Sequence, residues 1–207
     1  MKNYIKVVLL LFLIVSSNEI HAQIKSDYIM GLNLSTMSLK SKGVDTNPKT
    51  LVGIHFGEEF EIPLNDNIAF RPGLILSSKG SNYKNDTTDF SISPIYLEIP
   101  VNLVFSIGSD MVKVTLFAGS YFAWGVGGYK IEPGGDFKYL SFGAGDKRDL
   151  KPVDIGLNFG MGVNIKGFLI AAKYGKGIIN ISPVKSVDSE MKNNVIGISV
   201  SSSFIGK

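Results

Sequence analysis

The sequence predicts an all-β fold: an eight-stranded antiparallel up-and-down transmembrane barrel, preceded by a cleaved signal peptide. Eight stretches alternate apolar residues with glycine and small polar residues, which is the period of two that a β-strand imposes. The gaps between these stretches are alternately long and short, as extracellular loops and periplasmic turns are in outer-membrane barrels. The chain also opens with a basic and then apolar leader, which is typical of an exported protein.

The leader, MKNYIKVVLLLFLIVSSNEIHAQ, predicts a secretory signal peptide. Lys2 and Lys6 precede an apolar run, and the small residue Ala22 marks the expected cleavage site. An uncleaved anchor helix would need about 20 apolar residues, roughly twice the length of this run. We therefore expect residues 1–22 to be a signal peptide and residues 23–207 to form one outer-membrane β-barrel domain.

Composition excludes several classes of protein. The formal net charge of +3 falls to +2 when Lys2, Lys6 and Glu19 leave with the leader, so nothing indicates a nucleic-acid partner. The absence of cysteine excludes a lipid-modified N-terminal cysteine, a disulfide framework and a thiolate metal site. No later stretch holds the roughly 18 consecutive apolar residues of a membrane helix, so we expect the chain to enter a bilayer as strands.

The first four strands are expected at residues 28–37, 52–62, 68–78 and 97–105. In each of them apolar side chains alternate with glycine, small polar or charged ones. The apolar positions are Tyr28, Met30, Leu32, Leu34, Val52, Ile54, Phe56, Phe60, Ile62, Ile68, Phe70, Leu74, Leu76, Leu97, Ile99, Val101, Leu103 and Phe105.

The last four strands are expected at residues 111–126, 153–165, 168–175 and 193–204. The second of them has the most regular alternation, because aspartate, glycine and asparagine separate every pair of apolar residues. The apolar positions are Val112, Val114, Leu116, Phe122, Trp124, Val153, Ile155, Leu157, Phe159, Met161, Val163, Ile165, Phe168, Ile170, Tyr174, Ile196, Ile198, Val200 and Phe204. The connections between all eight strands are expected at residues 38–49, 63–67, 79–89, 106–110, 127–151, 166–167 and 176–192.

Alternation alone leaves open whether the apolar face points to lipid or into a core, as it does in a soluble periplasmic lipocalin-like carrier. The polar face favours lipid outside, because it is rich in glycine, asparagine and serine instead of the scattered lysine and glutamate of a water-facing surface. Aromatic residues also fall at both ends of the apolar face, as interfacial belts do. The belt residues are Tyr28, Phe60, Phe105, Phe168 and Phe204 at the short-turn end, and Phe122, Trp124 and Tyr174 at the other end.

The enclosed face carries charged residues and many glycines. An eight-stranded barrel is just filled by its own side chains, so we expect these charges to pair with one another in a lumen charge network. A proton or ion path is the alternative. The network residues are His55, Glu59, Glu61, Arg71, Glu98, Lys113, Asp154 and Lys173. The glycines either relieve crowding in a small, strongly curved barrel or line a ligand cavity.

Three residues do not fit the alternation. Glu58 falls on the lipid face, where an acid is costly, so it predicts a bulge, a thinned bilayer or a contact with a partner protein. Pro72 and Pro100 lie inside neighbouring strands and remove one hydrogen-bond donor each. We expect the two prolines to lie near one another and to weaken that part of the barrel wall.

No pattern in the chain predicts an enzyme, a cofactor or a metal site. His55 is the only histidine of the mature chain, and a single histidine without cysteine makes a transition-metal site improbable. Ser77 and Ser120 are available hydroxyls, but their spacing from a base does not single out either as a nucleophile. The long, charged loop at residues 127–151 is where we would first look for an external partner.

Several segments together resemble the PorT-like outer-membrane β-barrel proteins of the Bacteroidetes, a porin family. The similar segments are HAQ from His21, GLNLS from Gly31, FEIPLNDNIAFRPGLILSSKGSNY from Phe60, YLEIPVNL from Tyr96, GMGVNI from Gly160 and YGKGIINI from Tyr174. The resemblance covers most of the mature chain and implies an integral outer-membrane barrel. One member of that family serves in protein secretion, but the family shares no catalytic motif.

These observations lead to one expected function and two alternatives. The first is a non-enzymatic outer-membrane barrel with a structural or accessory role, linked to protein secretion or envelope assembly. Its partners would be outer-membrane lipid and an envelope protein bound through extracellular loops or the barrel wall. The second is a small porin-like channel or ligand-binding barrel, with a cavity of a few hundred Å³ among Gly73, Arg71, Gly156 and Gly160. The third is the soluble periplasmic carrier.

Overall fold

The computed structural model describes residues 24–41, 44–45, 48–85, 88–109, 111–145, 147–183 and 190–204. The expected signal peptide at residues 1–22 lies outside these residues, so its cleavage stays a prediction. In this described part of the chain, no helix is long and apolar enough to cross a membrane.

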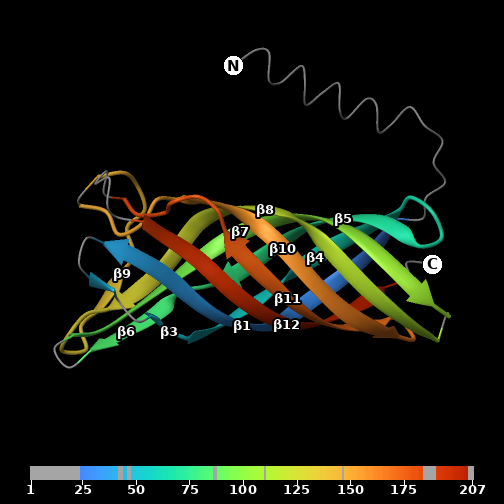
Figure 1. Ribbon diagram of the computed structural model, residues 1–207, viewed down its shortest axis with the longest axis horizontal. Helices are drawn as coiled ribbons and strands as arrows, with labels where there is room; N and C mark the ends of the chain where they lie inside the picture. Colours follow the sequence, from blue (N-terminus) through green and yellow to red (C-terminus); the bar gives the residue numbers. More distant parts are fainter. Residues whose placement is uncertain are drawn as a thin grey trace, which may run out of the picture.

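Eight strands pair antiparallel around a closed barrel, as the alternation predicted (Figure 1). Seven neighbouring pairs follow chain order, and the first and last strands pair along most of their length to close the ring. The barrel strands are β1 (Lys25–Ser41), β4 (Leu51–Pro63), β5 (Ile68–Ser78), β7 (Thr88–Gly108), β8 (Val112–Ile131), β10 (Val153–Ile165), β11 (Phe168–Gly177) and β12 (Glu190–Phe204). Two of the predicted ranges, 68–78 and 153–165, match their strands residue for residue.

Several strands run further than predicted at the long-loop end, where short strands continue the sheet. β6 (Ser81–Asn85) pairs with β7, and β9 (Phe137–Tyr139) pairs with β8. β2 (Val44–Asp45) pairs with β1, and β3 (Pro48–Lys49) pairs with β6. Figure 1 shows β3, β6 and β9 at one end of the barrel, opposite the end where the described chain begins and finishes.

The apolar face of the strands points outward and the polar face is enclosed. Along β10, Leu157 and Phe159 are 39% and 51% exposed, whereas Asn158 between them is 1% exposed. The expected belt residues are exposed in the same way, except that the side chain of Phe204 lies outside the described residues. The predicted separation of the two faces is therefore confirmed.

The two strand prolines lie close together, as predicted. Pro72 pairs in register with Val101, the residue next to Pro100. The ladder between β4 and β5 is interrupted opposite Pro72, and the ladder between β5 and β7 is interrupted opposite Pro100. β5 therefore has a break in its hydrogen bonding on each side, because proline cannot donate a backbone hydrogen bond.

Apolar side chains cover the lumen at the long-loop end. Met37 from β1, Tyr83 from β6 and Ile92 from β7 are buried there with two loop residues, Leu150 and Ile181. Tyr83 also donates a hydrogen bond from its hydroxyl to the backbone oxygen of Met37, over 3.0 Å. We call these five residues the apolar cap, and the charged lumen lies beneath it.

Candidate functional site: the charged lumen

Lys79 is at the centre of the buried charges. Its Nζ lies 2.6 Å from Oε2 of Glu98 and 3.7 Å from Oδ2 of Asp154. The ammonium group also lies 4.1 Å from the ring centroid of Tyr121, within reach of a cation–π interaction. The Lys79 side chain is 3% exposed, so two carboxylates and an aromatic ring surround a cation that water does not reach.

The two carboxylates have further partners from other strands. Lys173 on β11 approaches Oε1 of Glu98 at 3.4 Å, so Glu98 joins two lysines. Asp154 Oδ2 accepts hydrogen bonds from the Tyr121 hydroxyl at 3.1 Å and from Asn193 Nδ2 at 2.9 Å. The network therefore ties β7, β8, β10, β11 and β12 across the lumen to the end of β5.

His55 belongs to a neutral part of the same lumen. Its Nδ1 lies 2.9 Å from Oδ1 of Asn33, whose Nδ2 donates to Oγ of Ser77 at 3.0 Å. Asn33 thus bridges the histidine and the serine, and all three side chains are buried. This arrangement holds β1, β4 and β5 together and does not place the Ser77 hydroxyl on a general base.

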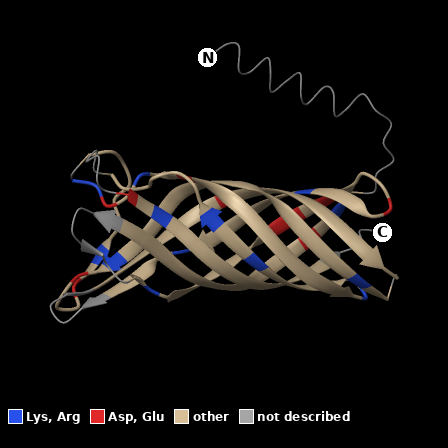
Figure 2. Ribbon diagram, viewed as in Figure 1, with Lys and Arg blue, Asp and Glu red and all other residues tan. Residues whose placement is uncertain are grey.

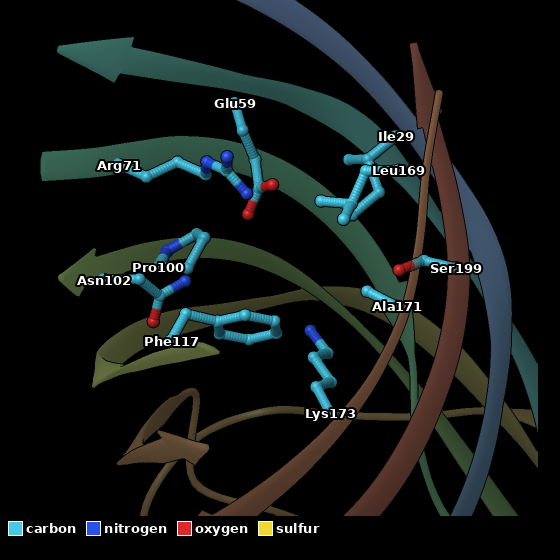
Figure 3. A pocket seen from close by; sticks show the side chains of 10 residues that line it. All are labelled: Ile29, Glu59, Arg71, Pro100, Asn102, Phe117, Leu169, Ala171, Lys173 and Ser199. Atoms are coloured by element: carbon cyan, nitrogen blue, oxygen red, sulfur yellow. The ribbon is translucent and has the colours of Figure 1, made fainter. Parts of the chain in front are cut away.

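Nearer the short-turn end, Arg71 forms an ion pair with Glu61 and is 6% exposed. A small cavity of about 20 Å³ lies beside the guanidinium. Figure 3 shows side chains from several strands around it, with the Glu59 carboxylate and the Arg71 guanidinium turned toward one another. The cavity is lined by Ile29, Glu59, Arg71, Pro100, Asn102, Phe117, Leu169, Ala171, Lys173 and Ser199.

The enclosed glycines make room for large neighbours. A Cβ atom on Gly160 would lie 2.1 Å from Cζ of Phe117, and one on Gly156 would lie 2.5 Å from Cε1 of Tyr121. On Gly125 a Cβ would lie 2.3 Å from the Phe142 ring, which extends into the barrel from a loop. Aromatic rings therefore occupy the space over Gly156 and Gly160, where the ligand-cavity alternative required open volume.

Of the residues in the predicted lumen network, five are buried and three are half-buried. The buried ones are His55, Glu59, Arg71, Glu98 and Asp154, and the half-buried ones are Glu61, Lys113 and Lys173. Contacts bring Glu61 together with Arg71, and Glu98 together with Lys173. Glu59 lines the same cavity as Arg71, and Asp154 lies near Lys79. Lys113 is half-buried near the start of β8, where it pairs in register with Asn164, so it lies at the short-turn end.

Lys79 was expected at the start of a connection, and β5 does end at Ser78, but the prediction missed that the Lys79 side chain is buried in the lumen. The apolar alternation stops at Ser78, which suggested that the strand interior ended there. Lys79 instead continues the inward series of alternate residues that includes Ile75 and Ser77, and its backbone N–H donates to the Pro94 oxygen at 3.0 Å. One further step of the alternation, two residues beyond Ser77, would have identified Lys79 as inward-facing.

Glu58 faces outward and is half-buried, and its carboxylate accepts a hydrogen bond from Ser26 on β1. It pairs in register with Tyr28, one of the belt residues, which places it near the short-turn interface. The predicted bulge is wrong, because the registers of β4 with β1 and with β5 run past Glu58 without a shift. The hydrogen bond from Ser26 partly compensates for removing this acid from water.

Outside the barrel, a second group of charges stabilises the long loop. Lys130 Nζ lies 2.7 Å from Oδ1 of Asp149 and 3.0 Å from Oε1 of Glu132. Partial burial would raise the pKa of Asp149, but hydrogen bonds from Lys130 and Ser141 outweigh it and hold the pKa below its ordinary value. Hydrogen bonds from Lys138 and Lys130 likewise lower the pKa of Glu132.

Among the described residues, no group of three or more histidine, aspartate or glutamate side chains is arranged to hold a metal ion. Several buried charges instead pair with one another, Lys79 with Glu98 and Asp154 and Arg71 with Glu61. Such pairing is the condition for keeping ionised groups away from water. Figure 2 shows charged residues on the strands of the barrel wall as well as in the loops at the β9 end.

Solved structures with a similar fold include several bacterial outer-membrane barrels. Ail of Yersinia pestis, solved with the heparin analogue sucrose octasulfate, is 15% identical with a TM-score of 0.44, over 87% of this chain and 99% of Ail. Neisserial surface protein A is 15% identical with a TM-score of 0.45, over 86% and 97% of the two chains. OprG of Pseudomonas aeruginosa is 12% identical with a TM-score of 0.45, over 91% and 100%. Similarities this low carry no functional argument.

No curated protein sequence matches the chain. The family model described as outer membrane protein beta-barrel domain matches residues 22–182, which is most of the chain. This match and the exposed apolar wall overturn the soluble-carrier alternative. The chain belongs to the outer membrane protein beta-barrel domain family, and the protein resides in the outer membrane.

Proposed function

We propose that this protein is a non-enzymatic accessory barrel of the outer membrane, with a filled lumen, that binds an envelope partner through its loops or wall. The observation that carries the proposal is the buried cluster of Lys79, Glu98 and Asp154 beneath the apolar cap. An open conducting path would need water around these charges. Their mutual pairing with almost no exposure instead supports a permanently plugged interior.

The competing function is a small channel or a barrel that holds a small solute. The cavity beside Arg71 and Lys173 is the feature that favours it. The size of this cavity argues against a solute-binding function. About 20 Å³ holds roughly one or two waters, whereas ligand pockets measure about 300–1,000 Å³.

Planar-bilayer recording distinguishes the accessory barrel from a channel. Purified mature protein is inserted into a phospholipid bilayer, and the current is followed under applied voltage in potassium chloride. The accessory-barrel proposal expects no stable conductance steps from the wild-type protein. Large and stable steps would overturn the proposal.

We propose the wall around Glu58 as one contact for the partner. A half-buried acid on a lipid-facing wall is costly unless something polar meets it, and among the described residues one hydrogen bond, from Ser26, meets Glu58. A photo-reactive phenylalanine analogue at Phe60, two residues along the same face, would capture a neighbour in intact cells. The same analogue at Phe168, an exposed belt residue on β11, is the matched control.

The cross-linking experiment has two possible outcomes. The proposal expects a cross-linked envelope protein from position 60 that is lost in a Glu58→Leu variant and is absent from position 168. Equal adducts from both positions would show that this wall is not the specific contact. We further propose that the chain is PorT-like, on the segments PGLILSSKG and YLEIPVNL, and that the captured partner serves in protein secretion or envelope assembly.

A further inference from the structure

β8 continues past the mouth of the barrel and forms a hairpin with β9. The turn is closed by hydrogen bonds from the Glu132 N–H to the Asp136 oxygen at 2.9 Å and from the Gly135 N–H to the Glu132 oxygen at 3.0 Å. Lys130 ties the hairpin to the following loop through Asp149, and Lys138 pairs with Glu132. Hydrogen bonds and ion pairs therefore hold the hairpin in its conformation.

The lysines of the hairpin are neutralised by carboxylates. Lys130 and Lys138 pair directly across the two strands, and both reach Glu132. Asp149 is a second anion beside Lys130, and Asp136 lies opposite Glu132 in the turn. Two lysines therefore face three carboxylates, so this side of the hairpin has no excess positive charge to attract an anionic ligand.

The other side of the hairpin is aromatic and exposed. Tyr139 is 83% exposed and Phe137 is 57% exposed, and Tyr129 is exposed beside them. The rings of Tyr129 and Phe137 stack with centroids 5.2 Å apart, and Phe137 meets Tyr139 edge-on at 5.5 Å. These three rings, which we call the aromatic platform, are held in place by one another and by the strand pairing.

The strand register places the platform on the outer side of the barrel wall. Leu97 on β7 faces outward and pairs with Trp124. Beyond the bulge, where β8 has the extra residue Val126, Ser93 on β7 lies on the same side as Leu97 and pairs with Tyr129. The platform therefore continues the lipid-facing surface of β8 upward from the belt residue Trp124.

The height of the platform identifies what surrounds it. The partners of Trp124 and Tyr129 on β7 are Leu97 and Ser93, four residues apart. A barrel strand advances about 3.3 Å per residue at a tilt of about 40°, so Tyr129 lies roughly 10 Å beyond Trp124 along the barrel axis. The headgroup layer of a phospholipid is only about 5–8 Å deep on each side. With Trp124 at the interface, the platform stands above the acyl chains and phosphates, where the sugars of outer-leaflet glycolipids extend.

We propose that the aromatic platform binds the saccharide headgroups of glycolipids in the outer leaflet. The positive edges of sugar C–H groups pack against the electron-rich faces of aromatic rings, and rigid rings lose little conformational freedom on binding. The lack of excess positive charge on the other side of the hairpin argues against phosphate as the recognised group. The inference rests on the outer-membrane location and is independent of the accessory role proposed above.

The test measures binding of the detergent-purified full mature protein to rough-type lipopolysaccharide, which carries a short core oligosaccharide. The double variant Phe137→Ala/Tyr139→Ala removes the two most exposed rings, and we expect it to lower the affinity about tenfold. Tyr139→Phe keeps the ring and should bind as the wild type does. Lys138→Gln, on the charged side of the same hairpin, is the matched control and should also bind normally.

Lipid A, which keeps its glucosamine disaccharide but lacks the core oligosaccharide, and phosphatidylglycerol serve as the alternative lipids. Binding to lipopolysaccharide that exceeds binding to both of these, and that falls only in the ring-deleted variant, supports the proposal. Equal binding to all three lipids, or equal binding by all variants, would overturn it. Folding of each variant is checked by its heat-dependent mobility on a gel, and Tyr139→Ala alone is used if the double variant fails to fold.

Sedimentation of the same samples tests whether a second copy of this chain covers the platform instead. If the platform were a contact between two copies of this chain, the wild type would sediment as a dimer and the ring-deleted variant as a monomer. That result would overturn the glycolipid assignment. The proposal expects the same sedimentation coefficient for both proteins in detergent.

Discussion

The Nζ atom of Lys79 and the Oε2 atom of Glu98 lie 2.6 Å apart in the barrel interior, with side chains 3% and 1% exposed. They come from the end of β5 and the middle of β7, and Asp154 from β10 completes the group. An ion pair so far from water is stable only while every charge keeps a partner. This pair is therefore the point at which the filled lumen is most sensitive to mutation.

Replacing Lys79 with methionine should destabilise the barrel strongly. The substitution leaves Asp154 without its cation and Glu98 with only Lys173, so the free energy of unfolding should fall by about 3 to 5 kcal/mol. Urea unfolding in lipid vesicles measures this change. Lys147→Met, at an exposed loop position, is the control and should stay within about 0.5 kcal/mol of the wild type. A similar, small effect for both variants would show that the lumen is hydrated.

Adding a methyl group at Gly125 should displace the loop ring that covers the lumen. The three atoms nearest to a Cβ there all belong to Phe142, the closest at 2.3 Å, so Gly125→Ala should cost about 1 to 3 kcal/mol. Combining it with Phe142→Leu should restore part of the stability. Gly127→Ala, where nothing lies within 4 Å, is the matched control. Failure of Phe142→Leu to rescue would mean that the ring does not sit over Gly125.

The ion pairs of the long loop predict a pH dependence. Because the folded pKa of Asp149 lies below its ordinary value of 3.8, this stabilisation is complete above pH 3.8 and is lost as the pH falls through the folded pKa. An NMR titration of the Asp149 carboxyl carbon should give a midpoint below 3.8. Lys130→Gln should raise that midpoint, since it removes a hydrogen bond to the carboxylate. A midpoint that is unchanged in Lys130→Gln would contradict the observed ion pair.

Glu58 should lower the stability of the isolated barrel. An acid on the lipid face costs energy, so Glu58→Leu should raise the free energy of unfolding in vesicles by about 1 kcal/mol. Glu58→Gln keeps a hydrogen-bond acceptor for Ser26, so its free energy of unfolding should lie between those of the wild type and Glu58→Leu. Destabilisation by Glu58→Leu would mean that the hydrogen bond to Ser26 outweighs the cost of placing the acid against lipid.

The strands and their two faces follow from local pattern alone, which is why they could be predicted. In β10 every alternate residue from Asp154 to Asn164 is polar or glycine, and a strand sends such residues to one side. The inward charges such as Glu98 and Arg71 follow from the same rule. No knowledge of neighbouring strands is needed for either prediction.

The contacts inside the lumen depend on which residues the closed barrel brings together. The register aligns Phe117 with Gly160, and Tyr121 with Gly156, but nothing in either segment alone indicates this alignment. The apolar cap likewise joins Met37 to Ile181, which are far apart in the chain. Lys79 was missed for a local reason, because a lysine after two serines resembles the start of a loop.

The most direct test of the account uses spin labels on β10, and the absence of native cysteine makes single-cysteine variants simple to prepare. Leu157→Cys, Asn158→Cys and Phe159→Cys are each spin-labelled at the cysteine and reconstituted in bilayers. Collision of each label with oxygen and with a water-soluble nickel chelate is then measured. If the apolar face contacts lipid, oxygen collision is strong at positions 157 and 159, and collision with either reagent is weak at position 158. Strong oxygen collision at position 158, with protection at 157 and 159, would contradict this orientation of the strand.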